Sequence, residues 1–108
     1  MITEESVAES APRDPNEIRD VTLKAFKNYL HDLESNFGEM ICPTCTGSLW
    51  NIPVSPNDTS HPNVVTFPMP LNAGYGVWAF HVICDRCGQM RFFEAASTID
   101  AMRRENKL

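Results

Sequence analysis

Two pairs of cysteines are the residues of this sequence best suited to chemistry. They lie in the segments Cys-Pro-Thr-Cys and Cys-Asp-Arg-Cys, at positions 42–45 and 84–87. Two residues between paired cysteines allow one tight turn to direct both sulfur atoms toward the same ion. Four thiolates leave no open coordination position, which is typical of structural zinc. We therefore predict one structural Zn²⁺ per chain, with four ligands: Cys42, Cys45, Cys84 and Cys87.

The residues around each pair suit tight turns, and we refer to residues 42–47 as the first knuckle and to residues 84–88 as the second knuckle. Pro43 stiffens the first turn. Gly47 and Gly88 follow the second cysteine of each pair, where the chain often needs a positive φ. The two pairs are separated by 38 residues. A hairpin with a long loop at residues 53–76 accommodates this interval.

Paired cysteines can also serve as redox dithiols, as disulfides or as iron ligands. Oxidoreductase dithiols open a helix within a βαβ pattern, and neither pair has that context. Disulfides are typical of secreted proteins, whereas no basic segment followed by an apolar stretch begins this chain. Iron in the same four thiolates, as in an electron carrier, is a third alternative. We expect a reducing, cytoplasmic setting, where paired cysteines usually hold a metal.

The knuckles and the strands around them resemble the zinc ribbon of the rubredoxin-like fold group. The segment 41–96 is also similar to small bacterial and phage zinc-ribbon proteins of unassigned function. In those proteins a knuckle followed by Trp pairs with a later Cys-x-x-Cys-Gly and an apolar strand, and here these features are Cys42–Trp50 and Cys84–Phe93. The resemblance covers about half the chain and implies a fold, with little to say about activity.

An N-terminal helix is predicted at residues 14–38 from apolar residues that recur at spacings of three and four. Asp14, Pro15 and Glu17 give a start signal, and Gly38 gives a stop signal. We expect the apolar face of this helix to pack on the ribbon, and the alternative is a homodimer through the same helix. Residues 1–13 are polar and lack this periodicity, so we interpret them as a flexible tail.

The remaining elements predict an α+β fold in one compact domain. Strands are expected at residues 49–54, 77–83 and 90–94, with a short edge strand at 64–67 because prolines flank it. Ser97 to Asp100 resemble a capping box that starts a short helix in the segment 97–108. The expected architecture is an amphipathic helix packed on a small antiparallel zinc-ribbon sheet of about three strands, residues 39–96, followed by a short C-terminal helix.

Side chains other than the cysteines give weaker signals. His81 lies three residues before Cys84, but four cysteines already complete a site, so we interpret it as a packed or surface strand residue. Cations and one aromatic residue are candidate contacts to nucleic acid or to a partner: Arg86, Arg91, Arg103, Arg104 and Trp78. The chain has a net charge of −5, whereas phosphate affinity rests on clustered cations. Nucleic-acid binding is therefore the second choice.

The sequence shows no recognisable set of catalytic residues. The predicted metal site has no open position for water, and neither a phosphate-binding glycine loop nor a Gly-x-Ser-x-Gly elbow is present. A small sheet cannot bury both of its faces, so apolar surface remains for a protein partner. We predict a non-enzymatic binding module, an adaptor or regulator. We expect no membrane role, because the longest apolar run, at residues 77–80 with 82–84 just beyond it, is too short to cross a bilayer.

Overall fold

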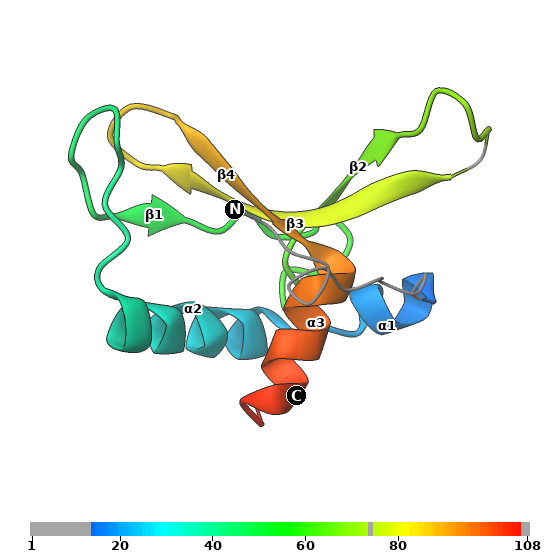
Figure 1. Ribbon diagram of the computed structural model, residues 1–108, viewed down its shortest axis with the longest axis horizontal. Coiled ribbons are helices and arrows are strands. Elements are labelled where there is room, and N and C mark those ends of the chain that lie inside the picture. Colours follow the sequence, from blue (N-terminus) through cyan, green and yellow to red (C-terminus); the bar gives the residue numbers. More distant parts are fainter. Residues whose placement is uncertain (1–13, 74, 107–108) are drawn as a thin grey trace, which may run out of the picture.

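The computed structural model of the protein describes residues 14–73 and 75–106, so the tail predicted at residues 1–13 lies outside the described chain. The fold is α+β, as the sequence predicts. Figure 1 shows a small antiparallel sheet with all of the labelled helices on one side of it. In chain order the elements are α1 Pro15–Arg19, α2 Leu23–Phe37, β1 Trp50–Asn51, β2 Val64–Pro68, β3 Gly76–Cys84, β4 Met90–Glu94 and α3 Ala95–Arg104.

β3 is the long central strand of the four-stranded sheet. It pairs antiparallel with each of the other strands. Phe80 pairs with both β2 and β4, and Ile83 pairs with both β1 and β4. Two partners of the same strand residue must lie on opposite edges of that strand, so β4 lies opposite both β2 and β1. β1 and β2 therefore share one edge of β3, and β4 occupies the other. The predicted strand at 49–54 shortens to β1, since Pro53 cannot donate a ladder hydrogen bond.

The helix predicted at residues 14–38 is divided into α1 and α2. Thr22 causes the division: its side chain accepts a hydrogen bond from the Ala25 N–H at 3.1 Å and so caps the start of α2. Val21, between the two helices, is only 1% exposed. The bend thus lets both helices direct apolar residues at the sheet. Gly38, with φ of 103°, ends α2 as predicted.

α2 packs on the sheet through aromatic contacts. The Phe26 ring lies 5.0 Å from the Phe80 ring and 5.9 Å from the Phe93 ring, measured between centroids. The predicted packing of the N-terminal helical region on a small antiparallel sheet is therefore confirmed. The buried core between the helices and the sheet comprises Ile18, Val21, Phe26, Tyr29, Leu30, Phe80, Val82, Ala95, Ile99 and Met102.

Part of the predicted loop at residues 53–76 is tied to the helices. Val54 and Pro62 form an isolated bridge, which brings the loop back toward β2. The Leu23 N–H donates to the Ser60 carbonyl at 2.7 Å, and His61 Nδ1 lies 2.9 Å from the Val21 carbonyl oxygen. These contacts satisfy backbone groups at the bend between α1 and α2.

The start of α3 differs from the predicted capping box. α3 begins at Ala95, and the Glu94 carboxylate accepts hydrogen bonds from the N–H groups of Ala96 and Ser97 at 3.2 and 2.7 Å. Thr98 instead donates from Oγ1 to the Glu94 carbonyl at 2.7 Å. The helix therefore follows β4 without a loop, and its cap is the last residue of that strand.

Candidate metal centre

The two knuckles are built with the same backbone hydrogen bonds. In each, the residue after the second cysteine donates its N–H to the carbonyl of the first cysteine, and the first cysteine donates to a carbonyl five residues later. The bonds are Thr46 N–H to Cys42 O at 2.9 Å, Gly88 N–H to Cys84 O at 2.9 Å, Cys42 N–H to Gly47 O at 2.8 Å and Cys84 N–H to Gln89 O at 2.8 Å. The site therefore consists of two equivalent turns, one before β1 and one between β3 and β4.

The positive φ angles fall at equivalent positions of the two turns, Thr46 at 61° and Gly88 at 84°. The prediction for Gly88 is confirmed, whereas the prediction for Gly47 is wrong because Thr46 takes the left-handed conformation one residue earlier. Gly47 has a different role. A Cβ at this position would lie 3.3 Å from the Cys45 Sγ, so glycine leaves space for the sulfur.

The four predicted ligands converge. Their Sγ atoms all lie within 4.8 Å of one another. Two short separations join the knuckles, at 3.5 Å from Cys42 to Cys87 and 3.4 Å from Cys45 to Cys84. Tetrahedral zinc with Zn–S bonds of about 2.3 Å separates its sulfurs by roughly 3.8 Å, whereas a disulfide bond is about 2.05 Å long. All four cysteines are free, and their spacing fits a single metal ion.

The thiols differ in how readily they ionise. Burial raises the pKa of Cys42, but hydrogen bonds from the backbone N–H groups of Cys45 and Thr44, with smaller contributions from neighbouring thiols, lower it to about 6. For Cys87 the hydrogen bond from the Gln89 N–H lowers the pKa, yet burial and the three other sulfur atoms raise it to about 12. The pKa of Cys84 is also lowered, chiefly by the hydrogen bond from the Cys87 backbone N–H, whereas the pKa of Cys45 is raised. The cluster therefore favours thiolates at the first cysteine of each pair and resists ionisation of the second. A bound cation supplies the positive charge that allows all four to ionise.

A polar side chain that carries no sequence signal contacts the cluster. Gln89 Oε1 lies 3.0 Å from the Cys42 Sγ and 2.9 Å from the Thr44 Oγ1. Gln89 stands at the position in the second turn that Gly47 occupies in the first. Sequence reasoning missed it because its role depends on the first knuckle lying against the second, which no local motif encodes.

Trp50 and Arg91 connect the first knuckle to the sheet. The Trp50 Nε1–H donates to the Met40 carbonyl at 2.7 Å. The Arg91 guanidinium lies 5.0 Å from the centre of the Trp50 ring, and its Nη2 donates to the Ile41 carbonyl at 2.9 Å. The segment that leads into Cys42 is thus held on both sides, so the first knuckle is positioned by β1 and β4 together.

The other predicted arginines fall at two separate places. Arg86, in the second knuckle, packs beside Gly47 of the first knuckle. Arg103 pairs with Glu17, and the exposed Arg104 ends α3. Figure 1 places the second knuckle, between β3 and β4, at one end of the sheet and the C-terminal end of α3 below the helices. The structure therefore does not bring the predicted arginines together into one patch.

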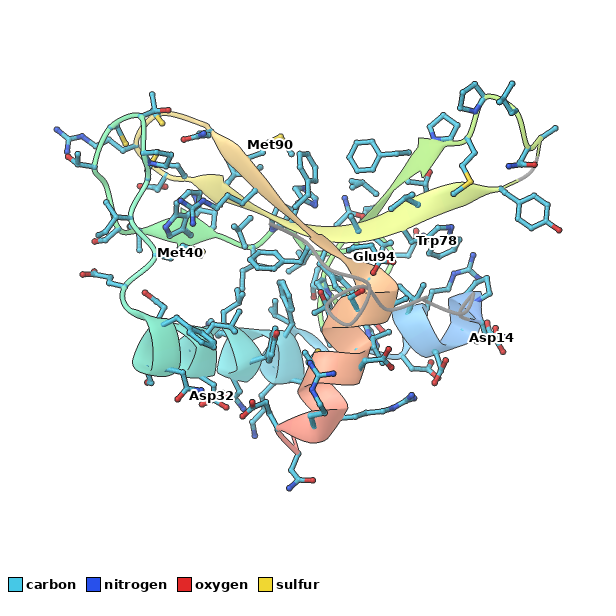
Figure 2. All side chains as sticks on the ribbon, in the orientation of Figure 1. Asp14, Asp32, Met40, Trp78, Met90 and Glu94 are labelled. Carbon is cyan, nitrogen blue, oxygen red and sulfur yellow. The ribbon has the colours of Figure 1, made fainter. Side chains whose placement is uncertain are left out.

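Trp78 and His81 both lie on β3, away from the cysteines. Figure 2 shows Trp78 on the side of the sheet that faces α1, where the Arg19 guanidinium lies 5.5 Å from its ring centre. His81 is 5% exposed, and its ring stacks on the Phe92 ring with 6.2 Å between centroids. Among the described residues, the cluster that could hold a metal ion consists of cysteines alone. The interpretation of His81 as a packed strand residue is therefore confirmed.

None of the helices within residues 14–73 and 75–106 is both long and apolar enough to cross a membrane. Comparisons of the chain with protein-family models, with curated proteins and with solved structures gave no match. The geometry of the cysteines is therefore the ground for any functional statement. It establishes an α+β protein with a four-cysteine cluster that could hold one metal ion.

Proposed function

We propose that the protein is a non-enzymatic zinc-ribbon module, in which one structural Zn²⁺ joins the two knuckles and the folded ribbon binds a protein partner. One observation carries the proposal. Two knuckles with the same hydrogen bonds bring four Sγ atoms within 4.8 Å of one another. Such a set of soft thiolate donors suits zinc, and it suits a structural site because cysteines fill every tetrahedral position.

The expected role of the ion is to stabilise the fold. Cys42 and Cys84 are buried, and between them they anchor the start of the first knuckle and the end of β3. When bound, zinc contributes folding free energy on the order of 10 kcal/mol. The backbone N–H groups of the turns help to offset the negative charge of the thiolates. These residues hold the ion without presenting a free coordination site, which supports a binding role over a catalytic one.

Exposed apolar side chains support a protein partner. Phe67, Met90 and Phe92 are each 40–50% exposed, and the Phe67 and Phe92 rings lie 5.1 Å apart. Figure 2 shows Met90 on the side of the sheet away from the helices. Grouped aromatic and Met side chains of this kind are enriched in protein interfaces.

Nucleic-acid binding receives less support from the cations. The Arg91 guanidinium already contacts Trp50 and the Ile41 carbonyl, and Arg103 pairs with Glu17. The chain carries a net charge of −5, and one Zn²⁺ with four thiolates adds about −2 more. A phosphate backbone requires the opposite balance of charge.

Native mass spectrometry before and after acid denaturation tests the proposal. We expect one zinc per chain, lost on denaturation, and a partner that is recovered in pull-downs whether or not nuclease is present. One iron per chain would replace the proposal with electron transfer. A metal-free chain lighter by four hydrogens would mean two disulfides and would overturn it. Loss of the partner after nuclease treatment would favour the nucleic-acid alternative.

A further inference from the structure

The outer edge of β4 offers backbone groups for a further strand. β4 pairs with β3 along one edge, and the Cys84 N–H to Gln89 O bond sets the alternation of the ladder. In an antiparallel pair every second residue bonds to the neighbour, so Arg91 and Phe93 bond to β3. The N–H and C=O groups of Met90 and Phe92 therefore point away from it. Within the described chain neither residue makes a backbone–backbone hydrogen bond outside the ladder.

A groove of about 620 Å³ runs beside this edge, between β4, the C-terminal half of α2 and residues 38–41. Leu33, Phe37, Met40 and Phe93 are among its lining residues. Phe37 is 84% exposed although it ends the apolar face of α2. A strand edge beside a helix with an apolar groove between them is the geometry in which peptide-binding domains add a strand.

The charges at the groove favour a basic occupant. Glu34 and Glu39 line it, and Glu39 is exposed. Arg91 also lines it, but its guanidinium is held by the Ile41 carbonyl and by Trp50. A second copy of this chain would bring another net charge of −5 to the same surface, which opposes self-association. A partner segment with apolar residues flanked by Lys or Arg has the complementary charge.

We propose that an extended segment of a partner protein adds as a strand to the edge of β4, with apolar side chains in the groove and flanking basic residues near Glu39. The inference rests on the proposed function and names the site and the chemistry of its partner. Successive side chains of a strand point to opposite faces, so alternate residues enter the groove against Leu33 and Met40. The intervening residues lie beside Phe92 and Met90 on the other face.

Amide hydrogen exchange on the zinc-loaded full chain tests the edge residue by residue. The probe is the peptide Lys-Val-Thr-Val-Thr-Val-Lys with blocked ends, titrated to 2 mM. At three times its dissociation constant, exchange of the Met90 and Phe92 amides should slow about fourfold, the factor 1 + [L]/Kd. The Arg91 and Phe93 amides, already in the ladder, should be protected without peptide. Absence of binding at 2 mM, or binding without protection of Met90 and Phe92, would overturn the inference.

Control peptides separate the two parts of the proposed chemistry. Replacing both Thr residues by Pro removes N–H groups that a strand needs, and replacing both terminal Lys residues by Glu reverses the charge. Both peptides should bind more weakly, and equal binding by either one would contradict the proposed occupant. Protection of Met90 and Phe92 that rises with protein concentration alone would assign the edge to a second copy instead.

Matched charge reversals locate the peptide on the surface. Glu39→Lys should weaken binding of the Lys-flanked peptide about two- to fivefold, the range expected for an exposed ion pair. Glu105→Lys makes the same change at the exposed end of α3, which Figure 1 shows apart from the end of α2, and should leave binding unchanged. Equal effects of the two variants would refute the site. One zinc per chain together with an unprotected β4 edge would reject this inference while leaving the proposed function standing.

Discussion

Removing the proposed zinc ion tests how far the fold depends on the knuckles. A structural zinc site contributes on the order of 10 kcal/mol, and domains of this size have a net stability of roughly 5–15 kcal/mol. The loss is therefore comparable to the whole free energy of unfolding. β3 transmits it, because this strand ends at Cys84 and is also the central strand of the sheet. We expect chelation to unfold the domain and not only the knuckles.

The two tryptophans report on opposite halves of β3. Trp50 lies next to the first knuckle through its bond to the Met40 carbonyl, and it pairs with Cys84. Trp78 pairs with Thr66 at the other half of the strand. The variants Trp50→Phe and Trp78→Phe each leave one reporter, so fluorescence follows the two halves separately.

The assay adds a chelator and a reducing agent to each single-tryptophan variant and records fluorescence and near-ultraviolet circular dichroism. Both reporters should change together, and excess zinc should restore both. Chelator already saturated with zinc is the control and should have no effect. If Trp50 changes while Trp78 and the near-ultraviolet signal stay native, the core between helices and sheet folds without metal, and the energetic reasoning fails.

Three further predictions concern single side chains, each measured by urea unfolding with zinc in excess. Gly76→Ala should destabilise by about 1–3 kcal/mol, because the new Cβ would lie 2.9 Å from the Phe67 carbonyl oxygen; unchanged stability would show that this backbone gives way freely. Burial lowers the pKa of His81, whose Nδ1 has no hydrogen-bond partner among the described residues. The folded protein therefore binds a proton at His81 less readily than the unfolded chain does. The stability that the neutral side chain contributes is present above about pH 6.5 and is lost as the pH falls. His81→Phe should therefore lose less stability than the parent between pH 7.5 and 5.5, and equal losses would contradict this. Glu94→Ala should cost about 1 kcal/mol through loss of the α3 cap, whereas Glu94→Gln, which keeps an acceptor, should cost less; equal costs would point away from the cap.

The metal cluster was predictable because its chemistry is local. Each Cys-x-x-Cys turn positions its own two sulfurs, so the spacing at residues 42–45 and 84–87 identifies the four cysteines of the cluster without knowledge of the fold. β4 has the predicted bounds, and β3 differs by one residue at each end. The β-branched and aromatic residues of these strands lie next to the second knuckle in the sequence. One short stretch of chain therefore carries both the strand pattern and the cysteine pair.

The helix boundaries were less predictable because capping side chains compete. The apolar repeat runs through Thr22 without interruption, yet that residue caps α2 while the Ser60 carbonyl accepts the Leu23 N–H. At the other end of the chain Glu94 caps α3 in place of the predicted Ser97. Which residue caps a helix depends on which backbone N–H groups the surrounding structure leaves without partners. For α2 one such partner, the Ser60 carbonyl, comes from a loop that is distant in sequence.

The sequence by itself determined the four-cysteine cluster, the fold class and the packing of an amphipathic helical region on a small sheet, because these follow from spacing and periodicity. Only the tertiary structure decided that β1 and β2 share one edge of β3 and that no other strand within residues 14–73 and 75–106 pairs with the outer edge of β4. It also decided that Gln89 reaches Cys42 and that Arg86, beside Gly47, is not joined by the arginines of α3, of which Arg103 pairs with Glu17. Strand order and edges arise from pairing between distant residues, and the local pattern of each strand is compatible with several such arrangements.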